Sequence, residues 1–282
     1  MIRIVGDTLS CIAPPEAAKL NLPLLPQLII FGETTYRDDF EISSPEFLEK
    51  LKAATVLPKT AAPPPQLYFP IFEKAKQNGD TLIILCPSAS LSGTYRSAMV
   101  AAQDFPETDI RILDTNLIAA GLGSVIRAAT LRRDQGASAE EILSFAEKMA
   151  ASETIFILVD TLEYLHKGGR IGGAQALFGS LLQIKPILTM EKGVIQPVES
   201  QRTKKTALAR IKELVMDSKP DPKTCHLCVQ HGGAEQDAVE LATWFADQLK
   251  LSHIPICDLP PAVLVHAGPK ALGVSFFRSE VG

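Results

Sequence analysis

Short apolar runs alternate with segments of helical spacing through the first half of the chain. The runs at residues 2–5 and 82–86 have the continuous aliphatic character of strands buried on both faces of a parallel sheet. Further strands are predicted at residues 24–31 and 110–114. Between these runs the apolar residues recur at helical spacing. Two predicted helices begin at Ser44 and at Ser138, and two others span residues 66–78 and 117–133.

The second half combines helices with strands that pair antiparallel. A strand is predicted at residues 154–159, and the strands at 185–190 and 194–198 are expected to form a β-hairpin whose three-residue loop ends in Gly193. Residues 203–216 predict an amphipathic helix. The remaining predicted elements are a helix that follows a glycine cluster at 168–173 and runs through Leu182, a strand at 225–230, a helix at 234–249 and two final strands.

These patterns predict an α/β protein with two domains. Residues 1–152 are expected to form an N-terminal domain with a mostly parallel sheet and helices on both faces. Residues 153–282 are expected to form a C-terminal α/β domain with antiparallel strand pairs. Ligands of parallel sheets bind at the carboxyl ends of the strands, so Asp7 and residues 88–94 and 115–116 are expected to share one crevice.

Composition places the chain among ordinary globular proteins. With 282 residues, 46% hydrophobic and 21% charged, it is not a disordered chain, a collagen-like repeat or a disulfide scaffold. The net charge of −4 argues against binding to nucleic acid, which normally requires a positive surface. No apolar run approaches the roughly 18 residues of a membrane helix, so integral membrane association is not expected.

Two features predict a cytoplasmic location. The five cysteines are odd in number and mostly far apart, which is typical of reduced thiols. The N-terminal residues enter a strand-like run directly and do not follow the plan of a signal peptide.

Nucleotide cofactors and metals are not indicated. The first predicted strand is followed by residues 6–10 (GDTLS), which lack the glycines of a dinucleotide-binding turn, and no P-loop motif occurs. Cys225 and Cys228 form a CxxC, but on the predicted strand their thiols point to opposite faces. Without a second pair at zinc-like spacing, they are expected to be buried free cysteines, and no metal site is predicted.

Ser92, between a predicted strand and a helix, has three interpretations. It can be a turn or cap residue, or it can donate to an anionic ligand beside the N–H groups of a helix N-terminus. It can also be the nucleophile of a serine hydrolase or acyltransferase with His266 as its base, although no GxSxG elbow and no orienting acid are present. These alternatives stay open at this point.

Two cationic features also have alternative interpretations. Arg170, flanked by glycines, is either part of a flexible loop or a fork that meets a carboxylate or phosphate. His266, expected in a loop between apolar strands, is either structural or a donor to an anion. A basic cluster is either a solvated helix face or a surface for an acidic partner. Its members are Arg202, Lys204, Lys205, Arg210 and Lys212.

Several stretches, in the same order along the chain, resemble the DegV family of bacterial fatty-acid-binding proteins. The resemblance covers nearly the whole chain, and the stretch from Asp160 to Ile171 is long enough to be specific. The matching stretches are residues 36–38 (YRD), 58–60 (PKT), 91–98 (LSGTYRSA), 159–171 (VDTLEYLHKGGRI) and 182–188 (LQIKPIL).

The resemblance implies a two-domain α/β protein that holds one long-chain fatty acid at the domain junction, with the tail in an apolar tunnel. The carboxylate-binding positions of the family match Thr60, Ser92 and Gly93, and the same polar end includes Arg170 and His266. It also implies a carrier without catalytic residues or cofactor, which in some relatives presents its fatty acid to a fatty acid kinase. A regulatory or scaffold protein, the third hypothesis, predicts an empty cleft.

The chain departs from the family pattern at two places. The family often has Asp-Ser-Thr after the first strand, whereas this chain has Asp7-Thr8-Leu9. The family often has KTSQPSP where residues 59–65 here read KTAAPPP, so that Ala61 lacks a hydroxyl that can contact a head group.

Overall fold

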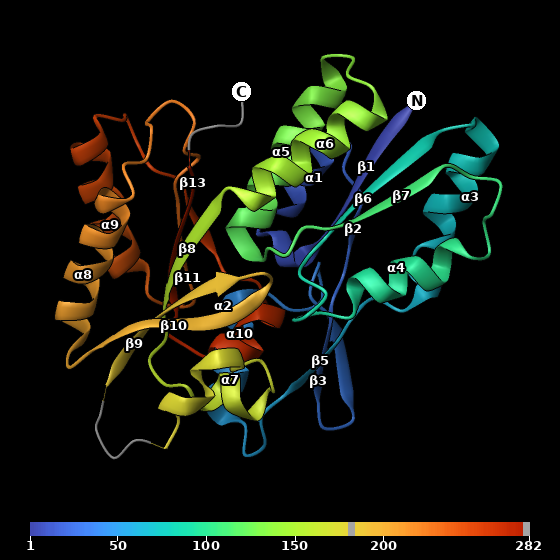
Figure 1. Cartoon of the computed structure of the whole chain (residues 1–282). Coiled ribbons are helices and arrows are strands. Elements are labelled where there is room, and N and C mark those ends of the chain that lie inside the picture. Colours follow the sequence, from blue (N-terminus) through green and yellow to red (C-terminus); the bar gives the residue numbers. More distant parts are fainter. Residues whose placement is uncertain (180–183, 279–282) are drawn as a thin grey trace. The chain divides into compact units, whose positions relative to one another are not determined.

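The chain folds into two compact units (Figure 1). The computed structural model describes residues 1–179 and 184–278. The first unit contains residues 1–43 and 58–151, and the second contains residues 44–57 together with the chain from Ser152 onward.

The segment 44–57, predicted from sequence to lie in the first domain, packs with the second unit. Its helix α2 (Ser44–Ala53) begins with the predicted Ser-Pro start and buries Phe47. The Ser44 hydroxyl donates to the carbonyl of Leu259 at 2.9 Å, and the helix packs against α10 (Pro261–Ala267) of the same unit. A hydrophobic stripe identifies this helix in the sequence but does not identify the core that it covers.

The first unit is built on a four-stranded parallel sheet in the order β2-β1-β6-β7. The two central strands are buried along most of their length, as the sequence pattern predicts for residues 2–5 and 82–86, whereas the edge strand at 110–114 is half-buried. The strands are β1 (Ile2–Asp7), β2 (Leu24–Leu25), β6 (Thr81–Cys86) and β7 (Ile110–Asp114).

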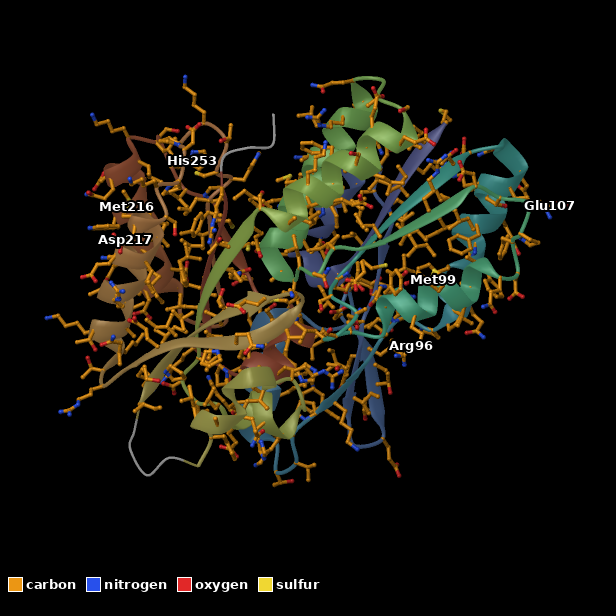
Figure 2. All side chains as sticks on the ribbon, viewed as in Figure 1. Arg96, Met99, Glu107, Met216, Asp217 and His253 are labelled. Carbon is orange, nitrogen blue, oxygen red and sulfur yellow. The ribbon has the colours of Figure 1, made fainter. Side chains whose placement is uncertain are left out.

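Helices cover both faces of this sheet. Val5 and Ile84 point to one face, where they pack with residues from α3 (Phe69–Asn78) and α4 (Thr94–Ala102). The other face is covered by α5 (Ala119–Asp134) and α6 (Ala139–Ala151), as Figure 1 shows. Arg96 and Met99, labelled on α4 in Figure 2, are exposed. A short helix, α1 (Pro14–Lys19), and two 3₁₀ turns, η1 (Thr8–Ser10) and η2 (Pro65–Leu67), complete the covering elements.

A small antiparallel sheet in the order β4-β3-β5 belongs to the same unit. The apolar run predicted as one strand at 24–31 is divided between β2 and this sheet, because the chain breaks at Pro26 and Gln27. The strands are β3 (Leu28–Phe31), β4 (Thr34–Arg37) and β5 (Lys59–Ala61).

The second unit has a six-stranded sheet in the order β10-β9-β8-β13-β11-β12. All neighbouring strands are antiparallel except β11 and β12. Helices α8 and α9 contribute the apolar core on one face, with Ile211 and Phe245 buried. The elements are β8 (Glu153–Leu158), β9 (Lys185–Glu191), β10 (Val194–Gln201), α8 (Lys204–Asp217), β11 (Cys228–His231), α9 (Glu235–Leu249), β12 (Ile256–Asp258) and β13 (Leu272–Phe277).

The predicted fold class is confirmed: one sheet is parallel with helices on both faces, and the other is an α/β layer with antiparallel pairs. Three further local predictions were wrong. The strand expected from residue 225 begins at Cys228, the hairpin loop is tighter than expected because β9 extends through Glu191, and a helix separates β12 from β13. The element after the glycine cluster is the 3₁₀ helix η3 (Gly172–Leu177), and the predicted end at Leu182 lies outside the described residues.

Candidate ligand-binding site

The start of α4 in the first unit carries the hydroxyls that the sequence singles out. Ser92 lies in the turn after β6, where its N–H donates to the Ser88 carbonyl at 2.9 Å. The Ser92 hydroxyl accepts from the Thr94 N–H at 3.3 Å and shares a hydrogen bond of 2.9 Å with the Thr94 hydroxyl. Ser92 therefore has the contacts of a turn residue, and it is half-buried, whereas Thr94 is buried.

Gly93 brings the segment after β5 beside this turn. A Cβ atom on Gly93 would lie 3.3 Å from the Cβ of Ala62, and the Ser97 hydroxyl donates to the carbonyl of Pro63. Thr60 lies in β5, two residues before this contact, and pairs with Ile29 of β3. The structure thus brings Ser92 and Gly93 together with the chain segment that carries Thr60.

A buried carboxylate accepts a hydrogen bond from the Thr94 hydroxyl. Asp7, at the end of β1, accepts the Leu9 N–H at 2.6 Å on Oδ1. Its Oδ2 accepts the Thr94 hydroxyl at 2.7 Å and the Gln27 side-chain N–H at 2.6 Å. Burial raises the pKa of Asp7 to about 6, and the three hydrogen bonds oppose that increase.

A second carboxylate, Asp38, belongs to the same network. Its Oδ1 accepts the Thr8 hydroxyl at 2.7 Å and the Gln27 backbone N–H at 2.8 Å. Burial raises the pKa of Asp38 to about 7, and the nearby charge of Asp7 raises it further. Gln27 therefore bridges the two acids, its side chain on Asp7 and its backbone on Asp38.

Sequence reasoning expected Asp7 and the 88–94 loop in one crevice, and the hydrogen bond between Asp7 and Thr94 brings them together. It did not identify Gln27, Asp38 or Thr94 as members of the network. Gln27 carried a usable signal, because a polar residue after Pro26 interrupts an otherwise apolar run. Asp38 carried one as well, because it ends the stretch 36–38 that resembles the family, although an acid after an exposed strand is normally a surface residue.

Arg170 and His266, in the second unit, form another polar cluster. The turn after α7 (Glu163–Lys167) is closed by the Arg170 N–H, which donates to the Leu165 carbonyl at 2.9 Å. The Arg170 guanidinium also donates to the Gly168 carbonyl at 2.7 Å. His266 lies against the same glycine: a Cβ on Gly168 would lie 2.2 Å from the imidazole Nδ1. His266 was expected in a loop, but the structure places it on α10.

The imidazole of His266 is held neutral. Burial and the positive charge of Arg170 lower the pKa of His266 to about 4. A neutral imidazole has one N–H donor and one acceptor nitrogen. Near neutral pH this cluster therefore contributes one cation and one neutral donor.

Within the first unit, no general base is hydrogen-bonded to the Ser92 hydroxyl. The hydrogen bonds of the Ser92 hydroxyl are to Thr94, which is not a general base. His266 belongs to the second unit.

The other candidate features of the sequence are accounted for within the second unit. Cys228 lies in β11 with its sulfur 3.8 Å from that of Cys257, and Cys225 precedes that strand.

Residues 1–179 and 184–278 hold no group of three or more His, Cys, Asp or Glu side chains able to hold a metal ion. Within the same ranges, no helix has the length and apolar character needed to cross a membrane.

Much of the basic cluster is engaged in local contacts. Lys204 pairs with Asp237 at 2.5 Å, and Arg210 pairs with Glu199 at 2.9 Å. The Lys212 ammonium lies 5.0 Å from the centre of the Trp244 ring. These contacts reduce the positive charge that this helix offers to a partner.

Comparison with known proteins decides the family. The family model described as "uncharacterised protein, DegV family" matches residues 1–279. The chain belongs to the DegV family. A DegV domain-containing protein of Streptomyces coelicolor is 33% identical, with 97% of each chain covered.

Solved structures of DegV proteins have the same fold. A DegV family protein from Thermus thermophilus, described by its fatty acid binding, has a TM-score of 0.91 and 28% identity, and the match covers 98% of this chain and 99% of the other. DegV from Bacillus subtilis, described as a fatty acid binding protein, has a TM-score of 0.86 and 29% identity over 98% of this chain and 99% of the other.

Proposed function

We propose that this protein binds one long-chain fatty acid and acts as a carrier that presents the carboxylate to a fatty acid kinase. Membership of the DegV family is the observation that carries the proposal. It is supported by two relatives of the same fold, at 28% and 29% identity, that are described by their fatty acid binding.

The carboxylate is held, in this proposal, by the hydroxyls of Thr60 and Ser92 and the backbone N–H of Gly93. The start of α4 favours an anion, because the N–H groups of a helix N-terminus carry partial positive charge. Arg170 and His266 are proposed to contact the carboxylate as well. The Arg170 cation offsets the ligand charge, and the neutral imidazole donates one N–H.

The energetics of such a complex divide between head and tail. Burial of about 15 methylene groups at roughly 0.8 kcal/mol each contributes on the order of 10 kcal/mol, part of which is offset by immobilisation. An unpaired carboxylate costs several kcal/mol to desolvate, so donors must receive it. The tail therefore supplies affinity, and the head group sets the position of the ligand.

The protein is proposed to have no catalytic residues and no cofactor. In the carrier role a kinase partner binds ATP and transfers the phosphoryl group, so this chain requires no nucleotide motif. The requirement on this chain is that it holds the head group where the kinase can reach it.

Mass spectrometry of lipid extracted from the purified protein tests the proposal. Recovery of near-stoichiometric long-chain fatty acid is expected, and a lipid-free preparation that also fails to take up added oleate contradicts it. Formation of acyl phosphate from the loaded protein, ATP and a bacterial fatty acid kinase tests the carrier role separately. Turnover of acyl esters that disappears in Ser92→Ala would replace the carrier with a hydrolase.

A further inference from the structure

The buried chain from Asp7 through Thr94 to Ser92 determines which way each hydroxyl proton points. Asp7 Oδ2, Thr94 Oγ1 and Ser92 Oγ follow one another at 2.7 Å and 2.9 Å. Each hydroxyl has one proton to donate, whereas an ionised carboxylate can only accept. The charge state of the acid therefore fixes the direction of every bond in the chain.

With Asp7 ionised, the Thr94 proton is committed to the carboxylate. The Thr94 oxygen then accepts from the Gln27 side-chain N–H at 2.9 Å and from the Ser92 hydroxyl. Since the Ser92 proton points at Thr94, the Ser92 oxygen presents only a lone pair to a ligand.

With Asp7 protonated, the directions reverse. The Asp7 O–H donates to Thr94 Oγ1, and the Thr94 hydroxyl donates to Ser92. The Ser92 oxygen already accepts the Thr94 N–H at 3.3 Å, so its own proton is left for a ligand. In this state Ser92 is a donor suited to a carboxylate.

We propose that Asp7 is a positioning residue for the ligand head group: through Thr94 it sets the direction of the Ser92 hydroxyl, so that a fatty-acid carboxylate is taken up together with one proton. This inference rests on the proposed function. The number of protons taken up is one in either case. If Asp7 becomes neutral, Ser92 donates to the ligand carboxylate. If Asp7 stays ionised, the head group itself is protonated and Ser92 accepts its hydrogen bond.

The surroundings of Asp7 favour uptake of that proton. Asp7 and Asp38 are both buried, with pKa values raised to about 6 and about 7, so both are largely ionised at pH 8 and the pair gains a proton readily below that. The other titratable groups coupled to Asp7 are Tyr68 and Cys86, which burial keeps neutral because it raises the pKa of each. Asp38 does not contact Thr94 through any of its described hydrogen bonds, so it supports the charge balance without orienting Ser92.

Calorimetry of oleate binding to the delipidated full-length protein at pH 8 tests the inference, with buffers of different ionisation enthalpy to count protons. Uptake of close to one proton per oleate is expected. By linkage, the dissociation constant then rises about tenfold per pH unit between pH 7.5 and 8.5. If Ser92 instead turns its proton away from Thr94 to meet the ligand, oleate binds with no proton uptake, and the inference is overturned.

Variants locate the proton. In Asp7→Asn, which keeps the side-chain shape, and in Thr94→Val, which cuts the chain, uptake is expected to fall to near zero. Asp38→Asn is the matched control: it removes a neighbouring buried charge and is expected to retain the uptake. His266→Gln is expected to weaken binding and to retain the uptake. Loss of the uptake in this variant alone would assign the proton to the imidazole and overturn the inference.

The wild-type result separates the two proposals. A wild-type protein that binds no oleate contradicts the proposed function and, with it, the inference. A wild-type protein that binds oleate without proton uptake contradicts the inference alone. Because this measurement uses the native chain, the result does not depend on whether the Asp7 variant folds.

Discussion

The two polar clusters of this protein are built in opposite ways. In the first unit, two buried acids accept hydrogen bonds from neutral hydroxyls, and Ser92, Thr94 and Asp7 form a continuous hydrogen-bonded chain. In the second unit, a cation lies beside a neutral imidazole, and both are placed by a glycine that leaves room for them. The first cluster sets hydrogen-bond direction, whereas the second supplies charge.

This difference predicts different responses to mutation. Loss of one member from a buried network leaves a partner unsatisfied, which costs more than loss of a half-exposed charge. Changes in the first cluster are therefore expected to act on affinity and on pH dependence. Changes in the second are expected to act through packing and through sensitivity to salt.

The largest effect is expected for Ser92→Ala. A hydrogen bond to a charged group contributes about 1.5–3 kcal/mol, so oleate affinity is expected to fall roughly 10- to 100-fold. Titration of the delipidated variant with oleate measures the change. Ser90→Ala is the control, since Ser90 is exposed in the same loop and should bind as the wild type does. Equal affinities for all three proteins would remove Ser92 from the site.

Asp7→Asn is expected to alter the pH dependence of stability. The pKa of Asp7 is raised from 3.8 to about 6 in the folded protein, so the folded state binds a proton that the unfolded state has lost. Stability of the wild type is therefore expected to fall as pH rises from about 4 to about 6, by up to roughly 3 kcal/mol.

Urea unfolding at several pH values measures this dependence. The variant should gain stability relative to the wild type as the pH rises, because Asn has no charge to bury. Asp104→Asn, an exposed acid of the same unit, is expected to keep the wild-type slope. If Asp7→Asn had the same slope as the wild type, Asp7 would not titrate in this pH range.

Gly168→Ala tests the packing of the second cluster. The new methyl group would lie 2.2 Å from His266 Nδ1, so the imidazole must move, and a loss of about 1–3 kcal/mol of stability is expected. In a His266→Ala background the same substitution should cost less, because the crowded partner is absent. Equal losses in the two backgrounds would assign the strain to the backbone instead.

The smallest effect is expected for Arg170→Ala. Since Arg170 is half-exposed, water and salt screen its charge, and a several-fold loss of oleate affinity that shrinks at high ionic strength is expected. Lys167→Ala, at the end of α7 and paired with Glu163, is the matched control. Unchanged oleate binding together with unchanged delivery to a kinase would remove Arg170 from the polar end.

The sequence predicts the parallel sheet well because its strands are continuous aliphatic runs, a pattern with one common structural solution. It fails at Cys225 and at His266, where a short apolar segment fits a strand, a turn or one helical turn equally well. It also fails at residues 44–57, since helical spacing identifies an apolar face and leaves the covering core unspecified.

The candidate site, like the fold, could be predicted from the sequence only in part. The five predicted site residues come from motifs that resemble those of a family. The fold brings together the chain segments of Thr60, Ser92 and Gly93 in the first unit, and Arg170 and His266 in the second. The sequence also places Asp7 in the expected crevice, but the hydrogen-bond network that joins Asp7 to Asp38 could not be predicted this way. Asp7 and Asp38 meet through Gln27, and such a meeting depends on how two separate sheets converge.

Gln27 also fixes the alignment of β3. Its backbone N–H donates to the Asp38 side chain while its carbonyl accepts the Asp38 N–H at 3.1 Å, so the start of β3 and the end of β4 are clamped to each other. A slip of β3 by one residue would break both bonds and turn Ile29, the partner of Thr60, from the core to the opposite face. Hydrogen exchange at the Gln27 amide thus reports on the alignment that holds Thr60 in place.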